Sequence, residues 1–411
     1  MPEKMQQINH VTQAVILVGG KGTRLGHLTQ DMPKPMMPIS ETKLFLDILI
    51  QEVTRYGIRQ IILLAGHLGD SVCARYHDST INGCAITVQI EERPMGTAGA
   101  LTLIKEQLAP MFFLLNGDSL FDIPLPLLSR KLHTHSNALL CMALKTNMSE
   151  NRYGNVSLDG DHVSAFDEKG QHQGDATINA GVYLCRREII DVLPDTPASL
   201  EQEIFPLLLS MKSLVGVTHD GYFIDIGLPN SLEQGRRELP RLLRRPAIFF
   251  DRDNTLNIDT GYTHKTSDLK WIKGAKKAIK AANDSGYLVI IVTNQSGIAR
   301  GLYTVDRMHE FHHEMQKQLS DIDAHIDAFY WCPFHKDAAL PAYAVNNHPD
   351  RKPNPGMIEK AISEWTINVQ SSFLIGDSPA DISAASKCEV KSQLIHPDED
   401  LSVVLEQVLL K

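Results

Sequence analysis

The stretch Ala247-Ile-Phe-Phe-Asp-Arg-Asp253 joins a short apolar run directly to two carboxylates. An earlier stretch has the same order, because Ala14-Val-Ile-Leu-Val18 leads directly into the turn Gly19-Gly-Lys-Gly-Thr-Arg-Leu25. Short continuous apolar runs are typical of strands that are buried on both faces of a sheet. Each stretch therefore predicts a buried strand with functional residues at its carboxyl end.

Further short apolar runs alternate with segments long enough to form helices, which indicates βαβ units. The other expected strands are residues 61–64, 86–90, 112–115, 139–143, 181–185, 288–292, 328–331 and 373–375. The 411 residues exceed the roughly 250–300 at which a single core stops growing. The segment Gly235–Pro246 is basic, contains prolines and is poor in β-branched residues, so we expect a short helix or linker there. The sequence predicts two α/β domains, residues 1–240 and 241–411.

The composition is that of a soluble globular protein, with 43% hydrophobic and 22% charged residues. A formal net charge of -9 argues against a general affinity for nucleic acid. No run approaches the roughly 20 apolar residues of a membrane helix, and Met1–His10 lacks the apolar core of a signal peptide. Six cysteines without CxxC spacing suit a reducing compartment. We expect a cytoplasmic protein with small-molecule partners, no nucleic acid and no membrane, and we leave homo-oligomer formation open.

The turn Gly19–Leu25 has the composition of a phosphate-binding loop. It matches neither a Walker sequence, which ends in Gly-Lys-Ser/Thr, nor the dinucleotide fingerprint, which needs glycine at its last position. Its three glycines let backbone N–H groups approach a phosphate chain, and Arg24 adds a cation with paired donors. Downstream, Pro33-Lys-Pro35 holds Lys34 on a stiff extended segment. The glycines alone favour an ordinary tight turn, but with Thr29 and Lys34 they predict a site for nucleotide phosphates.

Further motifs extend this pattern through the first half. They are Gly96–Ala100, Asn116–Asp118, Asp167–Lys169, Ile178–Gly181 and Tyr222–Gly227. With the turn, they resemble the sugar-1-phosphate nucleotidyltransferases over about residues 12–235. The resemblance implies a Rossmann-like fold in which Arg24 and Lys34 neutralise phosphates while Asp118 and Asp225 hold Mg²⁺. Contacts to the nucleotide or the sugar phosphate are implied for Gly19, Gly20, Gly22, Thr23, Glu91, Gly96, Thr97, Gly154, Glu168, Lys169 and Asn179.

Several of these residues allow simpler interpretations. Asp118 follows an expected strand, where open α/β sheets bind ligands, but Asn-Gly-Asp is also a turn sequence. The pair Glu168–Lys169 could be an exposed ion pair. Glu91 could be an exposed charge at a strand end, or it could contact the base as the family does. A carboxylate suits the two adjacent donors of guanine better than the single N–H of uracil, which favours GTP.

Particular motifs narrow this resemblance. They are Asn151–Gly154, Asp167–Gly170, Ser199–Glu201 and Gly221–Gly227. They most resemble the branch that acts on D-glycero-α-D-manno-heptose 1-phosphate with GTP. Mannose-1-phosphate guanylyltransferases are close relatives, and the sequence does not separate the two branches.

In the second half, four polar elements each follow an expected strand. Asp251 and Asp253 should project to the same side, so that one can attack a phosphorus while the other protonates the leaving alcohol. The other elements are Thr293–Ser296, Arg351-Lys352 and Gly376-Asp377. Each alone is typical of a turn. Because parallel strands bring such ends together, the four in this order predict one phosphatase site.

These residues resemble the haloacid-dehalogenase superfamily over about residues 246–390. The resemblance implies a Rossmannoid fold with Asp251 as nucleophile, Asp253 as general acid and base, and Lys352 as a cation. It implies Mg²⁺ at Asp251, Asp253 and Asp377, and substrate contacts from Asp259, Tyr262, Thr293, Asn294, Gln295, Ser296 and Arg351. Asn254 replaces the usual glycine, and asparagine accepts unusual backbone angles better than most residues. The motifs are closest to the heptose-1,7-bisphosphate 7-phosphatases, with histidinol-phosphate phosphatases as the nearest relatives.

One loop departs from that family. The family carries zinc on a Cys-x-His and a Cys-x-Cys, whereas this chain has Cys332, Phe334, His348 and Asp350 at those positions, with His335 adjacent. Cysteine, two histidines and aspartate could still form a tetrahedral site, but the loss of two thiolates favours a loop without metal.

The sequence His309–His313 also matches the HExxH pattern of zinc proteases. No third ligand stands at a familiar spacing, so we expect a solvated helix face.

We therefore expect a bifunctional enzyme of nucleotide-sugar synthesis. It would remove the 7-phosphate of D-glycero-D-manno-heptose 1,7-bisphosphate and couple the heptose 1-phosphate to GTP, giving GDP-heptose and pyrophosphate. Two alternatives remain open. One is a mannose-1-phosphate guanylyltransferase joined to a different small-molecule phosphatase. The other is a nucleotide-sugar sensor without catalysis.

Overall fold

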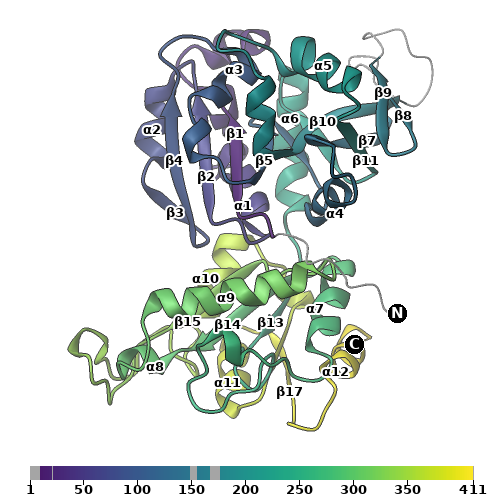
Figure 1. The fold of residues 1–411 in the computed structure, drawn as a ribbon. Coiled ribbons are helices and arrows are strands. Elements are labelled where there is room, and N and C mark those ends of the chain that lie inside the picture. The colour runs from purple at the N-terminus through teal and green to yellow at the C-terminus, as the bar shows by residue number, and fades with distance from the viewer. Residues whose placement is uncertain (1–9, 21, 149–154, 167–175, 411) are drawn as a thin grey trace, which may run out of the picture. The chain divides into compact units, whose positions relative to one another are not determined.

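A computed structural model describes residues 10–20, 22–148, 155–166 and 176–410 of the chain. The chain divides into two compact units (Figure 1). The first consists of Met1–Thr54 with Ile58–Pro240, and the second of Arg55–Gly57 with Arg241–Lys411. Both combine helices with a central sheet, which confirms the predicted α/β class.

Within its described residues, the first unit contains a ten-stranded mixed sheet. Its strands are β1 (Gln13–Leu17), β2 (Gln60–Ala65), β3 (Ser79–Ile81), β4 (Cys84–Ile90), β5 (Met111–Asn116), β7 (Leu140–Met148), β8 (Val156–Asp159), β9 (His162–Phe166), β10 (Ala176–Arg186) and β11 (Leu214–His219). They lie in the order β3-β4-β2-β1-β5-β10-β7-β11-β9-β8. Strands β4, β2, β1 and β5 are parallel, whereas β10 is antiparallel to β5 and β7. A separate ribbon pairs β6 (Ser119–Phe121) with β12 (Phe223–Asp225).

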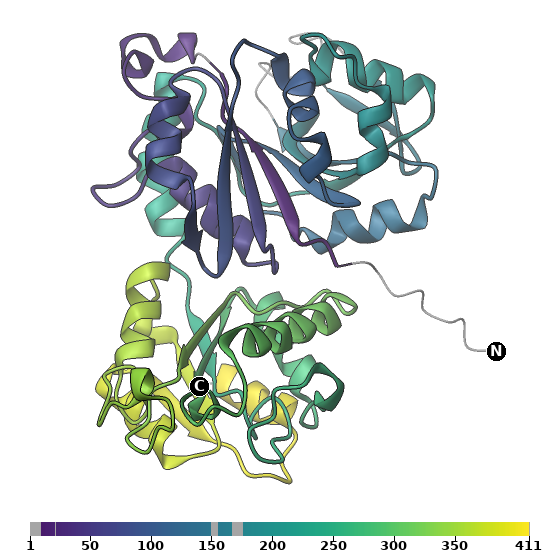
Figure 2. The same cartoon turned by 60° about the vertical axis from the view of Figure 1, so that its left-hand side comes forward.

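Helices cover both faces of this sheet (Figure 2). They are α1 (Phe45–Thr54), α2 (Gly69–Tyr76), α3 (Gly96–Thr102), α4 (Pro126–Thr134), α5 (Phe205–Ser210) and α6 (Pro229–Leu242), with 3-10 turns η1 (Thr23–Thr29) and η2 (Lys34–Met36). The middle of β1 is fully buried, as expected for a strand covered on both faces. One core joins the sheet to α3 and α5 through Ala98, Leu101, Phe205 and Leu208. Helix α6 covers most of the basic segment for which we expected a helix or linker, and Pro240 lies inside it.

The second unit contains a five-stranded parallel sheet. Its strands are β13 (Ala247–Phe250), β14 (Leu288–Asn294), β15 (Ala328–Cys332), β16 (Phe373–Gly376) and β17 (Lys391–Leu394). They lie in the order β15-β14-β13-β16-β17. Its helices are α7 (Ala275–Asp284), α8 (Ser296–Ala299), α9 (Val305–Ser320), α10 (Gly356–Trp365), α11 (Pro379–Lys387) and α12 (Leu401–Leu409).

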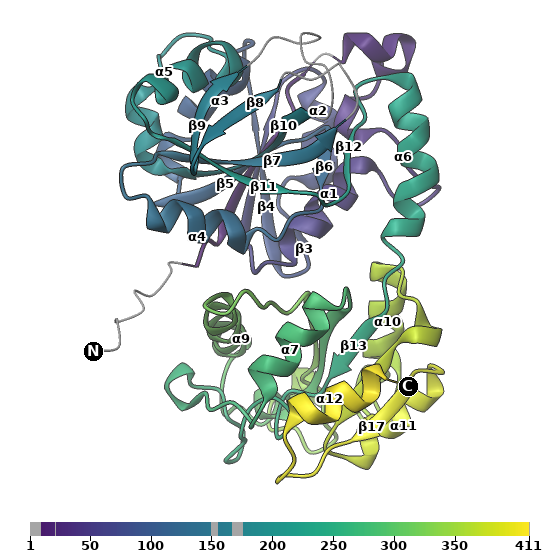
Figure 3. The same cartoon turned by 90° about the vertical axis from the view of Figure 1, so that its right-hand side faces the viewer.

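Two cores hold this sheet between its helices (Figure 3). One joins it to α7, α9 and α12 through residues such as Ala278, Phe311 and Leu405. The other joins it to α10 and α11 through residues such as Ile358 and Ala385. The carboxyl ends of the parallel strands therefore meet at one edge of the sheet.

Every expected strand is present, although β10 begins five residues before the apolar run that predicted it. The strands that were not expected are β3, β6, β8, β9, β11, β12 and β17. Most of these are short, and for the short strands the neighbouring strands rather than their own sequence decide the pairing. Within the described residues, no helix combines the length and apolar character needed to cross a membrane.

Candidate active sites

The first candidate site lies where β5 passes into β6 and where β12 ends. Asp118 precedes β6, and Asp225 ends β12, where it pairs with Ser119 across the ribbon. The Lys34 ammonium lies 2.5 Å from Asp118 Oδ2 and 3.5 Å from Asp225 Oδ1. The ribbon therefore brings together three predicted site residues that are far apart in the sequence.

The two carboxylates have the donor chemistry that Mg²⁺ prefers, because both offer hard oxygen ligands. Their mutual repulsion is offset by Lys34, whose side chain is only 12% exposed. The Asp118 and Asp225 side chains keep 34% and 26% of their surface exposed, so both can be reached from solvent. These residues fit a divalent cation that takes its further ligands from water and substrate oxygens.

A cavity of about 290 Å³ opens beside these residues. The predicted residues that line it are Gly19, Gly20, Lys34, Glu91, Gly96, Thr97 and Asp118. A Cβ atom on Gly19 would stand 2.8 Å from Glu91 Oε1. Gly96 has a φ of 72°, and a Cβ atom there would collide with the carbonyl oxygen of Ala198. Backbone conformation and space therefore require glycine at position 96, whereas a side chain at position 19 would displace the Glu91 carboxylate.

Glu91 supports the local turn as well as forming a wall of the cavity. Its Oε2 accepts a 3.0 Å hydrogen bond from the Met95 N–H, just before α3. Its Oε1 lies against Gly19. One carboxylate oxygen is thus already engaged, so Glu91 does not offer two unengaged oxygens to the adjacent donors of guanine.

The remaining predicted residues of the first half are placed differently. Thr23 and Arg24 are exposed on η1, which begins after Gly22, where φ is 61°. Asn179 Nδ2 donates a 2.8 Å hydrogen bond to the Tyr183 hydroxyl. The residues Gly154, Glu168 and Lys169 lie outside the described residues.

The second candidate site lies at the carboxyl ends of the parallel sheet. Asp251 directly follows β13, and Asp377 directly follows β16. The buried Lys352 ammonium lies 2.8 Å from Asp251 Oδ1 and 2.5 Å from Asp381 Oδ1. The backbone of Lys352 is fixed as well, because its N–H donates to Asn294 Oδ1 and its carbonyl accepts from Asn294 Nδ2.

Asp251, Asp377 and Asp381 can hold a metal ion, since they offer oxygen atoms within 4.8 Å of one another. Burial raises the pKa of Asp251 to about 7, although Lys352 opposes this shift. Burial, followed by the charge of Asp381, also raises the pKa of Asp377. A bound cation would offset the cost of keeping the buried Asp251 and Asp377 carboxylates charged, so these residues fit a divalent cation.

Asp381 was not predicted. It lies in the first turn of α11, where its Oδ2 accepts hydrogen bonds from the N–H (3.0 Å) and the hydroxyl (2.6 Å) of Ser378. It stands four residues after Asp377, but this spacing alone does not show that its carboxylate is buried against Lys352.

Asp253 is not part of this carboxylate cluster. The fully buried Arg252 donates to its carboxylate from Nε (3.0 Å) and Nη2 (2.9 Å). Gln295 Nε2 donates to Asp253 Oδ2 (2.9 Å) and to Thr293 Oγ1 (2.8 Å), and the Tyr303 hydroxyl donates to Gln295 Oε1 (2.6 Å). These contacts hold Asp253 in one orientation, and the role of Arg252 could not be predicted from the sequence.

The turn 259–263 adjoins this network, because Arg252 Nη2 donates to the carbonyl of Thr263. Asp259 Oδ1 accepts from the N–H groups of Gly261 (3.2 Å) and Thr263 (2.8 Å). Burial alone would raise the pKa of Asp259, but the hydrogen bonds from Thr263 lower it below its ordinary value. Asn254 has a φ of 58°, a conformation that asparagine accepts readily. Tyr262 is exposed in this turn, and Ser296 begins α8.

All four residues considered for zinc are described, and no three of them bring donor atoms within 4.8 Å of one another. Cys332 Sγ lies 4.0 Å from His348 Nδ1, which also accepts a hydrogen bond from the Asp350 N–H. The Asp350 carboxylate instead lies 2.5 Å from Lys360 Nζ. His335 Nδ1 accepts from the Asp337 N–H. The donor set of this loop does not fit zinc.

The HExxH segment lies on α9, but the expected solvated helix face is wrong for His312. His312 is 2% exposed and stacks on Phe329, with ring centroids 4.2 Å apart. Burial, followed by the charge of Arg252, lowers the pKa of His312 well below 6.5.

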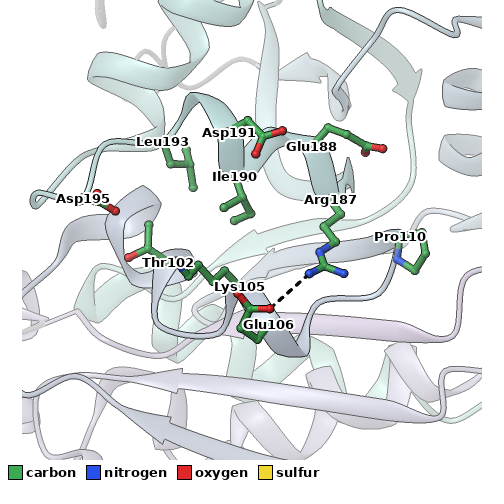
Figure 4. A pocket seen from close by; sticks show the side chains of 10 residues that line it. All are labelled: Thr102, Lys105, Glu106, Pro110, Arg187, Glu188, Ile190, Asp191, Leu193 and Asp195. Atoms are coloured by element: carbon green, nitrogen blue, oxygen red, sulfur yellow. Dashed lines mark ion pairs between the residues drawn. The ribbon is translucent and has the colours of Figure 1, made fainter.

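A groove of about 680 Å³ also lies in the first unit, between the segments 102–110 and 187–195 (Figure 4). It carries charges of both signs, including Arg187 and Glu106, which form a 3.8 Å ion pair across it. None of the predicted site residues lines this groove.

The chain belongs to the nucleotidyl transferase family, whose model matches residues 13–241. Residues 246–399 match the model of the polynucleotide kinase 3 phosphatase family. The two matches correspond to the two halves of the chain.

Individual relatives match each half. D-glycero-beta-D-manno-heptose-1,7-bisphosphate 7-phosphatase from Rhodopseudomonas palustris is 39% identical over 168 residues, which cover 41% of this chain and 92% of that protein. D-glycero-alpha-D-manno-heptose 1-phosphate guanylyltransferase from Aneurinibacillus thermoaerophilus is 34% identical over 229 residues, which cover 55% of this chain and 98% of that protein. Among solved structures, HddC from Yersinia pseudotuberculosis complexed with GMP-PN is 29% identical, with a TM-score of 0.48, covering 56% of this chain and 100% of that chain.

Proposed function

We propose that this chain is a bifunctional enzyme of GDP-heptose synthesis. The second unit removes the 7-phosphate of heptose 1,7-bisphosphate, and the first unit couples the resulting heptose 1-phosphate to GTP with release of pyrophosphate. One observation carries this proposal. The two halves match relatives named for these consecutive reactions, over 92% and 98% of the lengths of those relatives.

In the second unit, we assign the nucleophile to Asp251 and the general acid and base to Asp253. A carboxylate oxygen of Asp251 attacks the phosphorus, and the bond from phosphorus to the sugar oxygen breaks as Asp253 gives that oxygen a proton. Asp253 then takes a proton from the water that attacks the aspartyl phosphate, which releases orthophosphate and restores Asp251. The hydrogen bonds from Arg252 and Gln295 support this role by fixing the orientation of Asp253.

In the second unit, Lys352 and the hydroxyl of Thr293 would stabilise the negative charge of the bound phosphate. Lys352 touches the nucleophile, so its ammonium is placed to offset negative charge on a phosphate bound there. We propose Mg²⁺ at Asp251, Asp377 and Asp381, where it would offset the charge of the carboxylates and of the phosphate.

In the first unit, the phosphate oxygen of the sugar phosphate attacks the α-phosphorus of GTP, and pyrophosphate leaves. Lys34 and the backbone N–H groups of Gly19 and Gly20 line the cavity and can bind phosphate oxygens. We propose that the exposed Arg24 also binds the triphosphate. We propose Mg²⁺ at Asp118 and Asp225, where it would offset the developing charge of the leaving group.

We further propose that the activities separate near residue 240 and that phosphate removal comes first. Hydrolysis of the 7-phosphate is effectively irreversible in water. Its product, heptose 1-phosphate, would be the substrate of the nucleotidyl transfer, a reaction that pyrophosphate readily reverses. The six cysteines are free, which supports a cytoplasmic location. A catalytically silent sensor is disfavoured, because a binding module needs no phosphatase nucleophile.

The test supplies the intact protein with heptose 1,7-bisphosphate, GTP and Mg²⁺ and follows orthophosphate, pyrophosphate and GDP-heptose. Asp251→Asn should stop orthophosphate release and nearly all GDP-heptose formation, while added heptose 1-phosphate should restore the latter. Asp306→Asn, an exposed change in the same unit, serves as the matched control. If the Asp251 variant couples the bisphosphate as fast as the native protein, the order is wrong. A higher rate with mannose 1-phosphate would favour the mannose alternative.

A further inference from the structure

The segment from Cys332 to Lys352 connects the end of β15 to the buried cation of the second site. Phe334 lies near its beginning and His348 near its end. Their rings stack with centroids 4.0 Å apart and an interplanar angle of 10°. Tyr343 approaches Phe334 edge-on at 5.8 Å, and the His335 N–H donates to the carbonyl of Tyr343. The ring stack thus joins the two ends of the segment, and Tyr343 ties the middle of the segment to its beginning.

The same contacts reach the neighbouring Arg351. Its Nη1 donates a 3.2 Å hydrogen bond to the carbonyl oxygen of Phe334. Burial lowers the pKa of Arg351, although Cys332 opposes this shift, so its guanidinium is partly desolvated. The position of its side chain therefore depends on the position of the Phe334 backbone.

We propose that the stack of Phe334 on His348 closes this loop without metal and holds Arg351 toward a phosphorylated substrate. Phe334 and His348 are then positioning residues. By the resemblance to the phosphatase family, Phe334 stands at the position of a zinc-binding histidine, and His348 stands at the position of a cysteine. Stacked aromatic rings add about 0.5–1.5 kcal/mol beyond the area that they bury, so the stack can hold the two ends of the loop together where no metal does.

Lys352 has independent supports in Asn294, Asp251 and Asp381. Loss of the stack should therefore disturb Arg351 while leaving the Asp251–Lys352 pair in place. A variant that loses a contact made equally to the bound substrate and to the transition state has a higher KM and an unchanged kcat.

The first experiment measures zinc in the full-length protein, produced with zinc in the medium and then dialysed, by atomic emission spectrometry. We expect far less than one zinc per chain. One zinc per chain, lost together with thermal stability on chelation, would overturn the proposal. A triple variant, Phe334→His with His348→Cys and Asp350→Cys, gives the loop Cys-x-His and Cys-x-Cys ligands and should gain about one zinc per chain.

The second experiment measures phosphatase kinetics with heptose 1,7-bisphosphate. Phe334→Ala should raise KM roughly ten- to a hundredfold, the loss expected for one charge-assisted hydrogen bond, with kcat within about twofold of native. Phe334→Tyr keeps the ring and should behave as native. Leu340→Ala, which removes an exposed side chain from the same loop, is the matched control. An unchanged KM in a folded Phe334→Ala protein, or a loss confined to kcat, would overturn the proposal.

This inference rests on the proposed phosphatase activity only for its kinetic readout. If the native chain hydrolyses a general substrate such as p-nitrophenyl phosphate but not the heptose bisphosphate, the proposed substrate fails. The zinc content of the native and triple-variant proteins would still decide how the loop is closed.

Discussion

Replacing Lys352 with methionine would leave two carboxylates of the second unit without their shared cation. The Lys352 side chain is 3% exposed, and those of Asp251 and Asp381 are 13% and 0% exposed. Removing one partner of a buried ion pair costs about 3–5 kcal/mol, because the remaining charge is left desolvated. In a unit of about 150–250 residues, about 1 kcal/mol lowers Tm by about 2–4 °C. We therefore expect Lys352→Met to lower the Tm of this unit by about 6–20 °C.

Tryptophan fluorescence can follow this unit in the intact chain. All three tryptophans, Trp271, Trp331 and Trp365, belong to the second unit, so thermal unfolding monitored by their emission does not report on the first. The measurement is made in EDTA and repeated with Mg²⁺. A divalent cation at the three carboxylates would replace part of the missing positive charge, so Mg²⁺ should raise the Tm of the variant more than that of the native protein.

Lys360→Met provides the matched control. Lys360 lies 2.5 Å from Asp350, the same distance as Lys352 from Asp381, but its side chain is 55% exposed. Exposed ion pairs contribute little to stability, so this variant should unfold close to the native temperature. If Lys352→Met unfolds no earlier than Lys360→Met in EDTA, the reasoning from burial is refuted.

Three further predictions concern the other groups described above. Asp118→Ala should abolish nucleotidyl transfer and leave orthophosphate release intact, and loss of both activities in a folded protein would contradict separate sites. Glu91→Gln keeps an acceptor for the Met95 N–H. If the Glu91 carboxylate contacts guanine, this variant should reduce the preference for GTP over UTP about five- to a hundredfold. An unchanged ratio of the kcat/KM values for GTP and UTP would exclude that contact. The depressed pKa of His312 means that the unfolded chain binds this proton more readily than the folded chain, so stability is full above about pH 6.5 and falls by up to about 1.4 kcal/mol per pH unit below it. His312→Phe should flatten that fall in urea unfolding followed by tryptophan fluorescence, and an equally steep decline would assign it to other groups.

Much of the fold follows from apolar runs. The run that predicted β13 is fully buried, and so is the middle of the run that predicted β1, so local sequence and tertiary burial agree there. The short strand β17, with the sequence Lys-Ser-Gln-Leu, was not predicted because its partner β16 decides its conformation. Strand β11 contains the apolar run Leu-Val-Gly-Val and could have been predicted from its residues alone.

Some residues of the candidate sites could likewise be predicted from the sequence, and others could not. Residues that follow an apolar strand, such as Asp251 and Asp377, could be predicted because strand order alone brings them to one edge. Asp381 and Arg252 act through contacts made after folding, one across the start of α11 and one through a fully buried guanidinium. A sequence does not show that a charged side chain will be buried with its partners. The engagement of Glu91 by a backbone N–H likewise required the turn geometry.

The ribbon of β6 with β12 has a consequence for how the protein is synthesised. Asp118 emerges from the ribosome early, but its partner Asp225 lies almost at the end of the first unit, just before α6. Synthesis adds about 5–20 residues per second, so for several seconds a nascent chain holds most of its first sheet without a complete carboxylate pair. The nucleotide site is thus complete only when nearly all of the first unit has been synthesised, shortly before the ribosome reaches β13 of the second unit. A chain that stops before residue 223 could fold most of its strands and still lack the site.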